Sequence, residues 1–522
     1  MQALTASAAP DHQPARAGPT RQTGKLDWRD PLKAFALLGI LLNHLFEEFG
    51  RGPWFTNPWR DWPPLEERLR TFYPVEDPAW IAVPRFLGWL GDAGPGVFIF
   101  ASGLGLAYSL GTLPHLDARW IVDFYARRLS KLFPAYWFAH LLVATAAIVL
   151  PVALINLGSV ESLMSLAGLR LTPGTFFHVN PSWWFIWTIV QLYLLFPLLV
   201  IVQQRIGAGR LLLLSVVVTI AARGIGIAFV EDLYFWMTGR FGLTRLAEFT
   251  LGMWAAKWLI EHGGSLPAGL SSARRVLPLG TISYLAGLAF SIFLPTTVIS
   301  NLAVTAGLSL LFLAAWHGLR SILPRIVGRL SWIGAHSYGA YLIHQPFLKW
   351  AVQLSVPHGI GFGFGVALVV LTVSLPVGAW LERSSAQILL WLSNAGRARS
   401  RAGIAVAVAL LGAVLVLDPL LQPAVGRARA AFQILLVAAL LSLIGIELAA
   451  RSRRPDRSAW VRWWAIAATF ASLWIAPPGE ACLAVAATLA AALSSWIGLR
   501  YRSTASALAA GFGAVALLAT LS

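Results

Sequence analysis

Residues 30–44 read DPLKAFALLGILLNH and open the first apolar segment that is long enough to cross a membrane. A helix turns by about 100° per residue, so Lys33 and His44 lie on one face and are about 16 Å apart along the axis. Placing ionisable side chains inside a membrane costs free energy, and such residues are often functional. The pair is either a site that combines a cation with a proton-transfer group, or a polar pair hydrogen-bonded to neighbouring helices.

The composition is that of a membrane protein. Hydrophobic residues make up 57% of the chain and charged residues 12%, whereas soluble domains carry about 25% charged residues. We therefore predict an all-α polytopic membrane protein embedded in the lipid bilayer. The net charge is +17, but the basic residues cluster in short loops, where they set membrane orientation, and no nucleic-acid partner is expected. The single cysteine, Cys482, excludes an internal disulfide framework.

The apolar runs divide the chain into a core and an extension. Ten runs predict a ten-helix membrane domain within residues 27–384, and they lie near 31–48, 93–112, 134–156, 183–203, 211–230, 246–262, 276–294, 298–317, 330–353 and 359–381. A basic linker follows at 385–402. Residues 403–522 predict an accessory bundle of about five transmembrane helices. This bundle is a candidate surface for a homo-oligomer or for another membrane protein.

The distribution of basic residues predicts the orientation. Residues 1–26 are polar and lack the apolar stretch of a signal peptide, so we expect a disordered cytoplasmic tail. Basic loops then alternate with apolar runs, as expected for a multi-pass protein of a bacterial inner (plasma) membrane with a cytoplasmic N-terminus. The long loops near 49–92 and 157–182 fall outside. Their aromatic residues either stack on sugar rings or rest among the lipid headgroups.

Five motifs follow one another in the core. They are DPLK-x10-H over 30–44, PGVFIFASG over 95–103, RRLSKLFP over 127–134, WFI over 184–186 and SYGAYLIH over 337–344. In this order, over roughly residues 27–381, the chain resembles the acyltransferase 3 family of integral membrane acyltransferases. The resemblance implies transfer of an acyl group, often acetyl from acetyl-CoA, to hydroxyls of envelope or secreted glycans, and sometimes to lipids.

Three departures from the family pattern matter. Lys33 stands where the family has an arginine, and it loses the bidentate fork of a guanidinium. Ile189 and Val190 stand where many members carry a pair of glutamates. The C-terminal esterase-like domain of some members is replaced by the additional apolar runs.

Acyl transfer to a hydroxyl needs a base and groups that offset the oxyanion charge. Histidine is the usual base near neutral pH, so His44 is the predicted catalytic residue, in agreement with the resemblance. Lys33 is predicted to contact a CoA phosphate. Arg127, Arg128 and Lys131 lie three to four positions apart, so a helix would put Arg127 or Arg128 beside Lys131. These residues either bind the CoA phosphates or only set the orientation.

Four other residues are predicted to line the substrate cavity, between the first, second, third and ninth apolar runs: Ser102, Arg245, Tyr341 and His344. Tyr341 and His344 lie three positions apart and share a helical face. Ser102 alternatively serves close helix packing next to Gly103. Arg223 lies within a predicted membrane helix and needs a partner, for which Glu248 is one option.

The resulting prediction is a membrane-bound O-acyltransferase that moves an acyl group from acyl-CoA, as a co-substrate, to a hydroxyl of a glycan or glycolipid. No tightly bound cofactor is expected, and no metal cluster has credible ligand spacing. The main alternative is a glycan or lipid transporter that retains the fold without catalysis. A sensor or scaffold protein is a third reading, in which the extra helices dock a partner.

Overall fold

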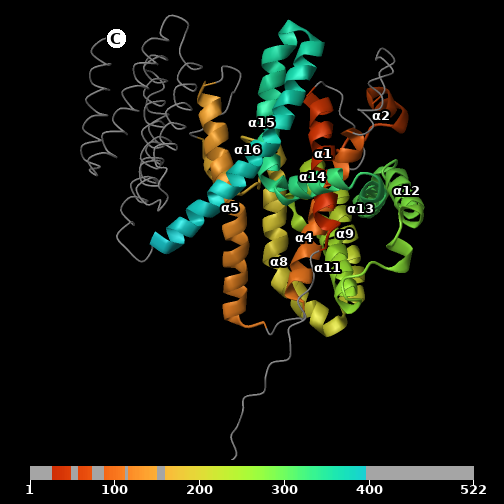
Figure 1. Cartoon of the computed structure of the whole chain (residues 1–522). Helices are drawn as coiled ribbons and strands as arrows, with labels where there is room; N and C mark the ends of the chain where they lie inside the picture. Colours follow the sequence, from red (N-terminus) through yellow and green to blue (C-terminus); the bar gives the residue numbers. More distant parts are fainter. Residues whose placement is uncertain (1–25, 49–56, 73–87, 112–115, 150–158, 396–522) are drawn as a thin grey trace, which may run out of the picture. The chain divides into compact units, whose positions relative to one another are not determined.

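The stretch that begins at Asp30 forms the central part of helix α1, Arg29–Glu48 (Figure 1). The computed structural model describes residues 26–48, 57–72, 88–111, 116–149 and 159–395. Predictions for most of the N-terminal tail and for the accessory bundle at 403–522 lie outside these ranges. Within them the secondary structure is helical throughout, with no strand, so the all-α prediction is confirmed.

The long helices follow the predicted apolar runs closely. After α1 they are α4 Gly94–Leu110, α5 Ala118–Val149, α8 Trp184–Ile206, α9 Ala208–Phe229, α11 Leu246–Glu261, α12 Ala273–Phe290, α13 Thr297–Ile322, α15 Ser337–Ser355 and α16 Ile360–Ala395. Five segments of the described chain are long and apolar enough to cross a membrane: Gly88–Leu110, Pro181–Ile206, Ala208–Phe229, Leu294–Ile322 and Gly361–Gln387. The protein is therefore a polytopic α-helical membrane protein.

Three elements differ from the predicted boundaries. The run at 330–353 is two helices, α14 Pro324–Ala335 and α15, because the helix breaks at His336. Gly339 lies in the first turn of α15, where backbone amides have no acceptor within the helix. Its amide donates to the carboxylate of Glu382. Helix α5 begins at Ala118, well before residue 134. At this start the Asp117 side chain accepts a hydrogen bond from the Trp120 amide at 2.7 Å. Helix α16 continues to Ala395, into the range predicted as a linker.

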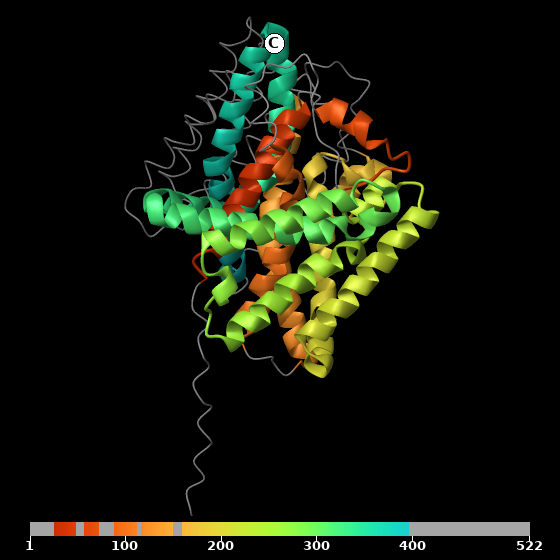
Figure 2. The same cartoon turned by 90° about the vertical axis from the view of Figure 1, so that its right-hand side faces the viewer.

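The chain divides into two compact units, and the unit that holds α1 contains residues 1–133, 170–352 and 364–382. In it α1 packs against α4, α13 and α14, while α12 and α13 lie side by side along most of their length (Figures 1 and 2). A Cβ added at Gly103 would lie 2.0 Å from the carbonyl oxygen of Phe249, and one added at Gly252 would lie 2.1 Å from that of Phe100. The backbones of α4 and α11 are thus in direct contact through glycines.

Another glycine contact brings a short helical turn onto α1. The turn η2, Gly91–Ala93, precedes α4, and a Cβ at Gly91 would lie 1.9 Å from the carbonyl oxygen of Gly39. Only glycine allows this approach. It places Asp92 beside the C-terminal half of α1, where His44 lies.

Candidate active site

Two histidine side chains meet in the core of this unit. His44 comes from α1 and His344 from α15, and their rings are parallel within 8°, with centroids 5.0 Å apart. His44 Nδ1 lies 2.8 Å from His344 Nε2. His344 is fully buried, so its nitrogens need partners inside the protein.

The bonding partners assign the protons of this pair. His344 Nδ1 lies 2.8 Å from the carbonyl oxygen of Tyr341, and a carbonyl only accepts, so Nδ1 of neutral His344 carries the proton. His344 Nε2 is then the acceptor, and His44 donates to it from Nδ1. Nε2 of neutral His44 is left with a lone pair, which is the form that a general base requires.

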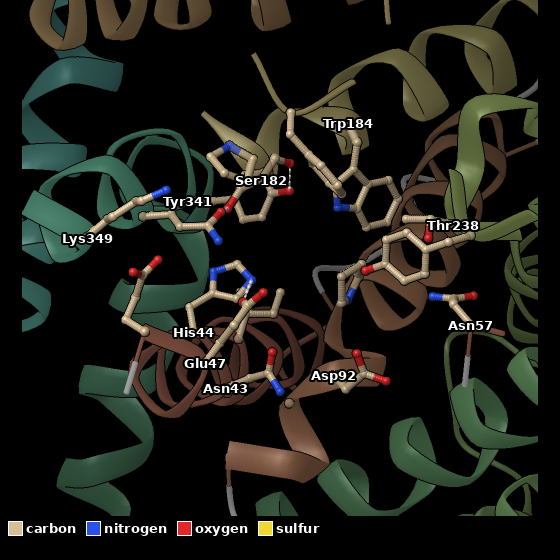
Figure 3. Close-up of a pocket in the computed structure, with 18 of the residues that line it drawn as sticks. Asn43, His44, Glu47, Asn57, Asp92, Ser182, Trp184, Thr238, Tyr341 and Lys349 are labelled. Atoms are coloured by element: carbon tan, nitrogen blue, oxygen red, sulfur yellow. Dashed lines mark hydrogen bonds and ion pairs between the residues drawn. The ribbon is translucent and has the colours of Figure 1, made fainter. Parts of the chain in front are cut away.

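His44 lines a cavity of about 390 Å³ (Figure 3). His44 Nε2 lies 3.9 Å from Oε2 of Glu47, one turn further along α1. At this distance the carboxylate is beyond hydrogen-bonding range, but it stabilises a positive charge on the imidazole. The arrangement can take up a proton at Nε2 and hold the resulting imidazolium.

The cavity lies at the C-terminal end of α1, and residues from distant parts of the chain contribute to it. Its polar lining consists of Asn43, His44, Glu47, Glu48, Asn57, Asp92, Ser182, Tyr234, Thr238, Arg245, Tyr341, Gln345 and Lys349. Its apolar lining includes Ile40, Pro95, Phe177, Pro181 and Trp184. Figure 3 shows Asn43, Glu47 and Asp92 on one side, and Ser182, Trp184 and Tyr341 on the other.

Two of the predicted cavity residues, Tyr341 and Arg245, line this cavity. The Tyr341 hydroxyl donates to the carbonyl oxygen of Ser182, which fixes the start of α8 against α15. Arg245 ends the turn η5, Gly242–Arg245, and its Nη1 lies 3.0 Å from Oε1 of Glu248. Both partners of this ion pair are almost fully buried, which is favourable only when the two charges stay together.

The short elements between α9 and α11 form part of the wall. They are α10 Leu233–Phe235, η4 Trp236–Arg240 and η5, and they contribute Tyr234 and Thr238. Burial, followed by the charges of Glu47 and Asp92, raises the pKa of the Tyr234 phenol, so its hydroxyl stays protonated and can donate. We predicted that the third apolar run would contribute, but none of the described lining residues comes from α5.

Lys33 lies away from the cavity, toward the other end of α1. Its Nζ is 3.0 Å from Oδ1 of Asp30, and Glu382 contributes a further negative charge. About a fifth of the side chain is exposed. Lys33 and His44 therefore lie on one helix, as predicted, and each has its own polar surroundings.

The predicted phosphate-binding residues lie on the N-terminal part of α5. Arg127 and Lys131 are exposed and Arg128 is partly buried. The Arg128 guanidinium lies 5.8 Å from the ring centroid of Phe124 and interacts electrostatically with Tyr193. Its Nε is buried without a hydrogen-bond partner. None of these three residues lines the cavity around His44.

Ser102 does not line the cavity among the described residues. Its side chain interacts with that of Tyr193 on α8, while the adjacent Gly103 provides the close contact with α11 described above. Arg223 is fully buried and donates to the carbonyl oxygens of Met237 and Thr297 at 3.3 and 3.1 Å. Glu248, one predicted partner of Arg223, forms its ion pair with Arg245.

Several lining residues were not predicted as site residues, and they come from loops and helix ends. Asp92 and Lys349 had no motif to mark them, whereas Asn43 could have been found from its position next to His44 at the same membrane depth. In the described part of the chain, no cluster of three or more His, Cys, Asp or Glu side chains is arranged to hold a metal ion.

The apolar helices and the buried histidine pair beside a polar cavity are the features of an enzyme-like site in a membrane protein. The acyltransferase domain that characterises the acyltransferase 3 family matches residues 26–381. The chain belongs to this family and is a membrane acyltransferase. Comparisons with curated proteins and with solved structures find no match.

Proposed function

We propose that this protein is an acyl-CoA-dependent O-acyltransferase of the bacterial inner membrane. It transfers an acyl group, in the simplest case acetyl, to a hydroxyl of an envelope glycan or glycolipid. The observation that carries the proposal is the hydrogen bond between His44 and His344, because it leaves His44 Nε2 as an unprotonated base at the cavity. Family membership supports acyl transfer in general.

In the proposed reaction the acceptor hydroxyl enters the cavity and gives its proton to His44 Nε2. Its oxygen attacks the thioester carbonyl carbon, the carbon–sulfur bond breaks, and the thiolate of CoA takes the proton from His44. The ester product and free CoA then leave. His344 holds the ring of His44 in the reactive tautomer, and Glu47 stabilises the transient imidazolium.

Negative charge develops on the thioester oxygen during the attack, and donors in the cavity would offset it. Asn43 is buried beside His44 and carries an amide donor. Arg245 lines the same cavity with a guanidinium that Glu248 holds in place. We assign these two side chains as the oxyanion contacts, a role that hydrogen-bond donors of this kind fill in other acyl transfers.

In the proposed arrangement each substrate approaches a different end of α1. With the N-terminus in the cytoplasm, Lys33 lies near the cytoplasmic side and the cavity lies toward the outer side, about 16 Å further along the helix. Lys33, Arg127, Arg128 and Lys131 would then meet the phosphates of acyl-CoA on the inside. The pantetheine arm would carry the thioester along α1 to His44, and the acceptor would approach from the outer side.

The test is acceptor-dependent release of CoA. The full-length protein in nanodiscs is given acetyl-CoA with and without a glycan extract of the host envelope, and the acylated glycan is identified by mass spectrometry. The proposal predicts that CoA release and ester formation rise together when the extract is added. A folded protein that releases no CoA with any extract, yet moves glycans across proteoliposomes, would contradict it.

A further inference from the structure

The cavity around His44 carries more carboxylates than cations. Glu47, Glu48 and Asp92 line it together with Arg245 and Lys349. Arg245 is balanced within the protein by the buried carboxylate of Glu248. Lys349 therefore faces three acidic side chains among the described lining residues.

Aromatic side chains also line the cavity. Phe177, Trp184 and Tyr234 are among them, and Figure 3 shows Trp184 across the cavity from Asp92. Neighbouring rings support two of them: Tyr234 stacks on Trp59 with centroids 5.3 Å apart, and Trp184 lies parallel to Phe176 at 6.5 Å. The aromatic surface is thus held in place before a ligand enters.

Together the acidic and aromatic lining residues match a sugar ring that carries no charge. The apolar C–H face of a sugar packs on flat aromatic side chains, and its hydroxyls donate to carboxylates, which accept strongly. A cavity of about 390 Å³ lies at the lower end of the size range for small-molecule sites. This volume suits one ring with a short extension better than a long stretch of polysaccharide.

We propose that the cavity selects neutral sugar rings and rejects rings that carry a carboxylate, sulfate or phosphate. An anionic substituent would enter a confined space already lined by Glu47, Glu48 and Asp92, and like charges at close range oppose binding of the wrong partner. The inference rests on the proposed function in one respect, because it takes this cavity to be the acceptor site.

Equilibrium binding without acyl-CoA tests the selectivity directly. The full-length protein in nanodiscs is titrated at mildly alkaline pH, where the carboxyl groups of Glu47 and Glu48 are ionised. The ligands are three matched pairs of methyl glycosides: glucoside and glucuronide, galactoside and galacturonide, mannoside and mannuronide. We expect at least one neutral glycoside to bind about tenfold or more tightly than its acid. Equal or tighter binding of the acids in every pair would overturn the inference, as would failure of every neutral glycoside to bind at millimolar concentration.

Two charge-removing variants show which residues set the preference. Glu48→Gln and Asp92→Asn keep the size of each side chain and remove its charge, so the preference for the neutral glycoside should narrow by about threefold or more. Glu261→Gln is the matched control, since Glu261 is exposed on α11 and pairs with Lys257. A preference that stays unchanged in both cavity variants would contradict the assignment.

The design separates this inference from the proposed function. Binding is measured with no acyl donor, so a protein that prefers neutral glycosides but never releases CoA would refute acyl transfer and leave the selectivity intact. A protein that acylates uronic acids as readily as neutral sugars would refute the selectivity and leave acyl transfer intact.

Discussion

His44 Nδ1 lies 2.8 Å from His344 Nε2, although the two residues are 300 positions apart in the chain. The His344 ring donates to the carbonyl oxygen of Tyr341. The position of the proton on His344 therefore determines the position of the proton on His44. Because the hydrogen bond between His44 and His344 joins two rings that are parallel within 8°, His44 has little freedom to turn away. A buried residue that never touches the cavity thus sets the protonation of one that does.

Loss of His344 should therefore slow the reaction without abolishing the fold. His344→Leu removes an acceptor for His44, and a hydrogen bond to a charged group is worth about 1.5–3 kcal/mol. This predicts a drop in kcat of roughly 10- to 150-fold, with KM for acyl-CoA little changed. His344→Gln offers an amide oxygen as a substitute acceptor and should retain more activity. A folded His344→Leu protein with wild-type kcat would refute the positioning role.

The pair formed by Arg245 and Glu248 predicts an effect on stability. Glu248→Ala leaves a buried guanidinium without its carboxylate, and breaking such a pair costs about 3–5 kcal/mol. The unfolding midpoint in nanodiscs should fall markedly. Glu261→Ala breaks the exposed pair with Lys257 and should change stability by less than about 1 kcal/mol. Equal midpoints for the two variants would show that Arg245 does not depend on Glu248.

The local features of the fold could be predicted from the sequence. Apolar length and helical period depend on neighbours in the chain, so α1 and the presence of Lys33 and His44 on this one helix followed directly. The pairing of Arg245 with Glu248 also has a local signal, a spacing of three residues on a helix.

Features that depend on packing could not be predicted in this way. The contact between His44 and His344 joins α1 to α15, and no local pattern reveals which helices meet. The break at His336 depends in part on Glu382, which lies on α16. Asp92 reaches the cavity because Gly91 packs on Gly39, a contact between two segments that lie far apart in the sequence.

Recognition of the CoA 3′-phosphate can be tested on α5. If Arg127 and Lys131 contact this group, the Arg127→Ala/Lys131→Ala protein should show a raised KM for acetyl-CoA, with kcat little changed. The wild type should distinguish acetyl-CoA from acetyl-dephospho-CoA, and the variant should not. Arg210→Ala, which removes an exposed basic residue of α9, is the control. A variant that still distinguishes the two donors would place the phosphate elsewhere.

The role of Lys33 can be separated from that of its neighbour Asp30. Lys33 Nζ lies 3.0 Å from Asp30 Oδ1, so Lys33→Met could impair the protein simply by removing one of the two cations near that carboxylate, the other being Arg29. We predict that the Lys33→Met/Asp30→Asn double variant stays impaired in KM for acyl-CoA, because the contact with the donor is lost in both. Lys33→Arg keeps the charge and should remain active. A double variant with the wild-type KM for acyl-CoA would show that Lys33 acts only as the ion-pair partner of Asp30.

The most direct test of the central claim is acceptor-dependent CoA release by His44→Ala beside the wild type and His262→Ala. His262 is an exposed histidine stacked on Trp258 and controls for the loss of an imidazole elsewhere. General-base catalysis contributes about 10²- to 10⁴-fold, so kcat should fall by that factor in His44→Ala only. A folded His44→Ala protein that releases CoA at the wild-type rate would contradict the assignment of His44 as the base.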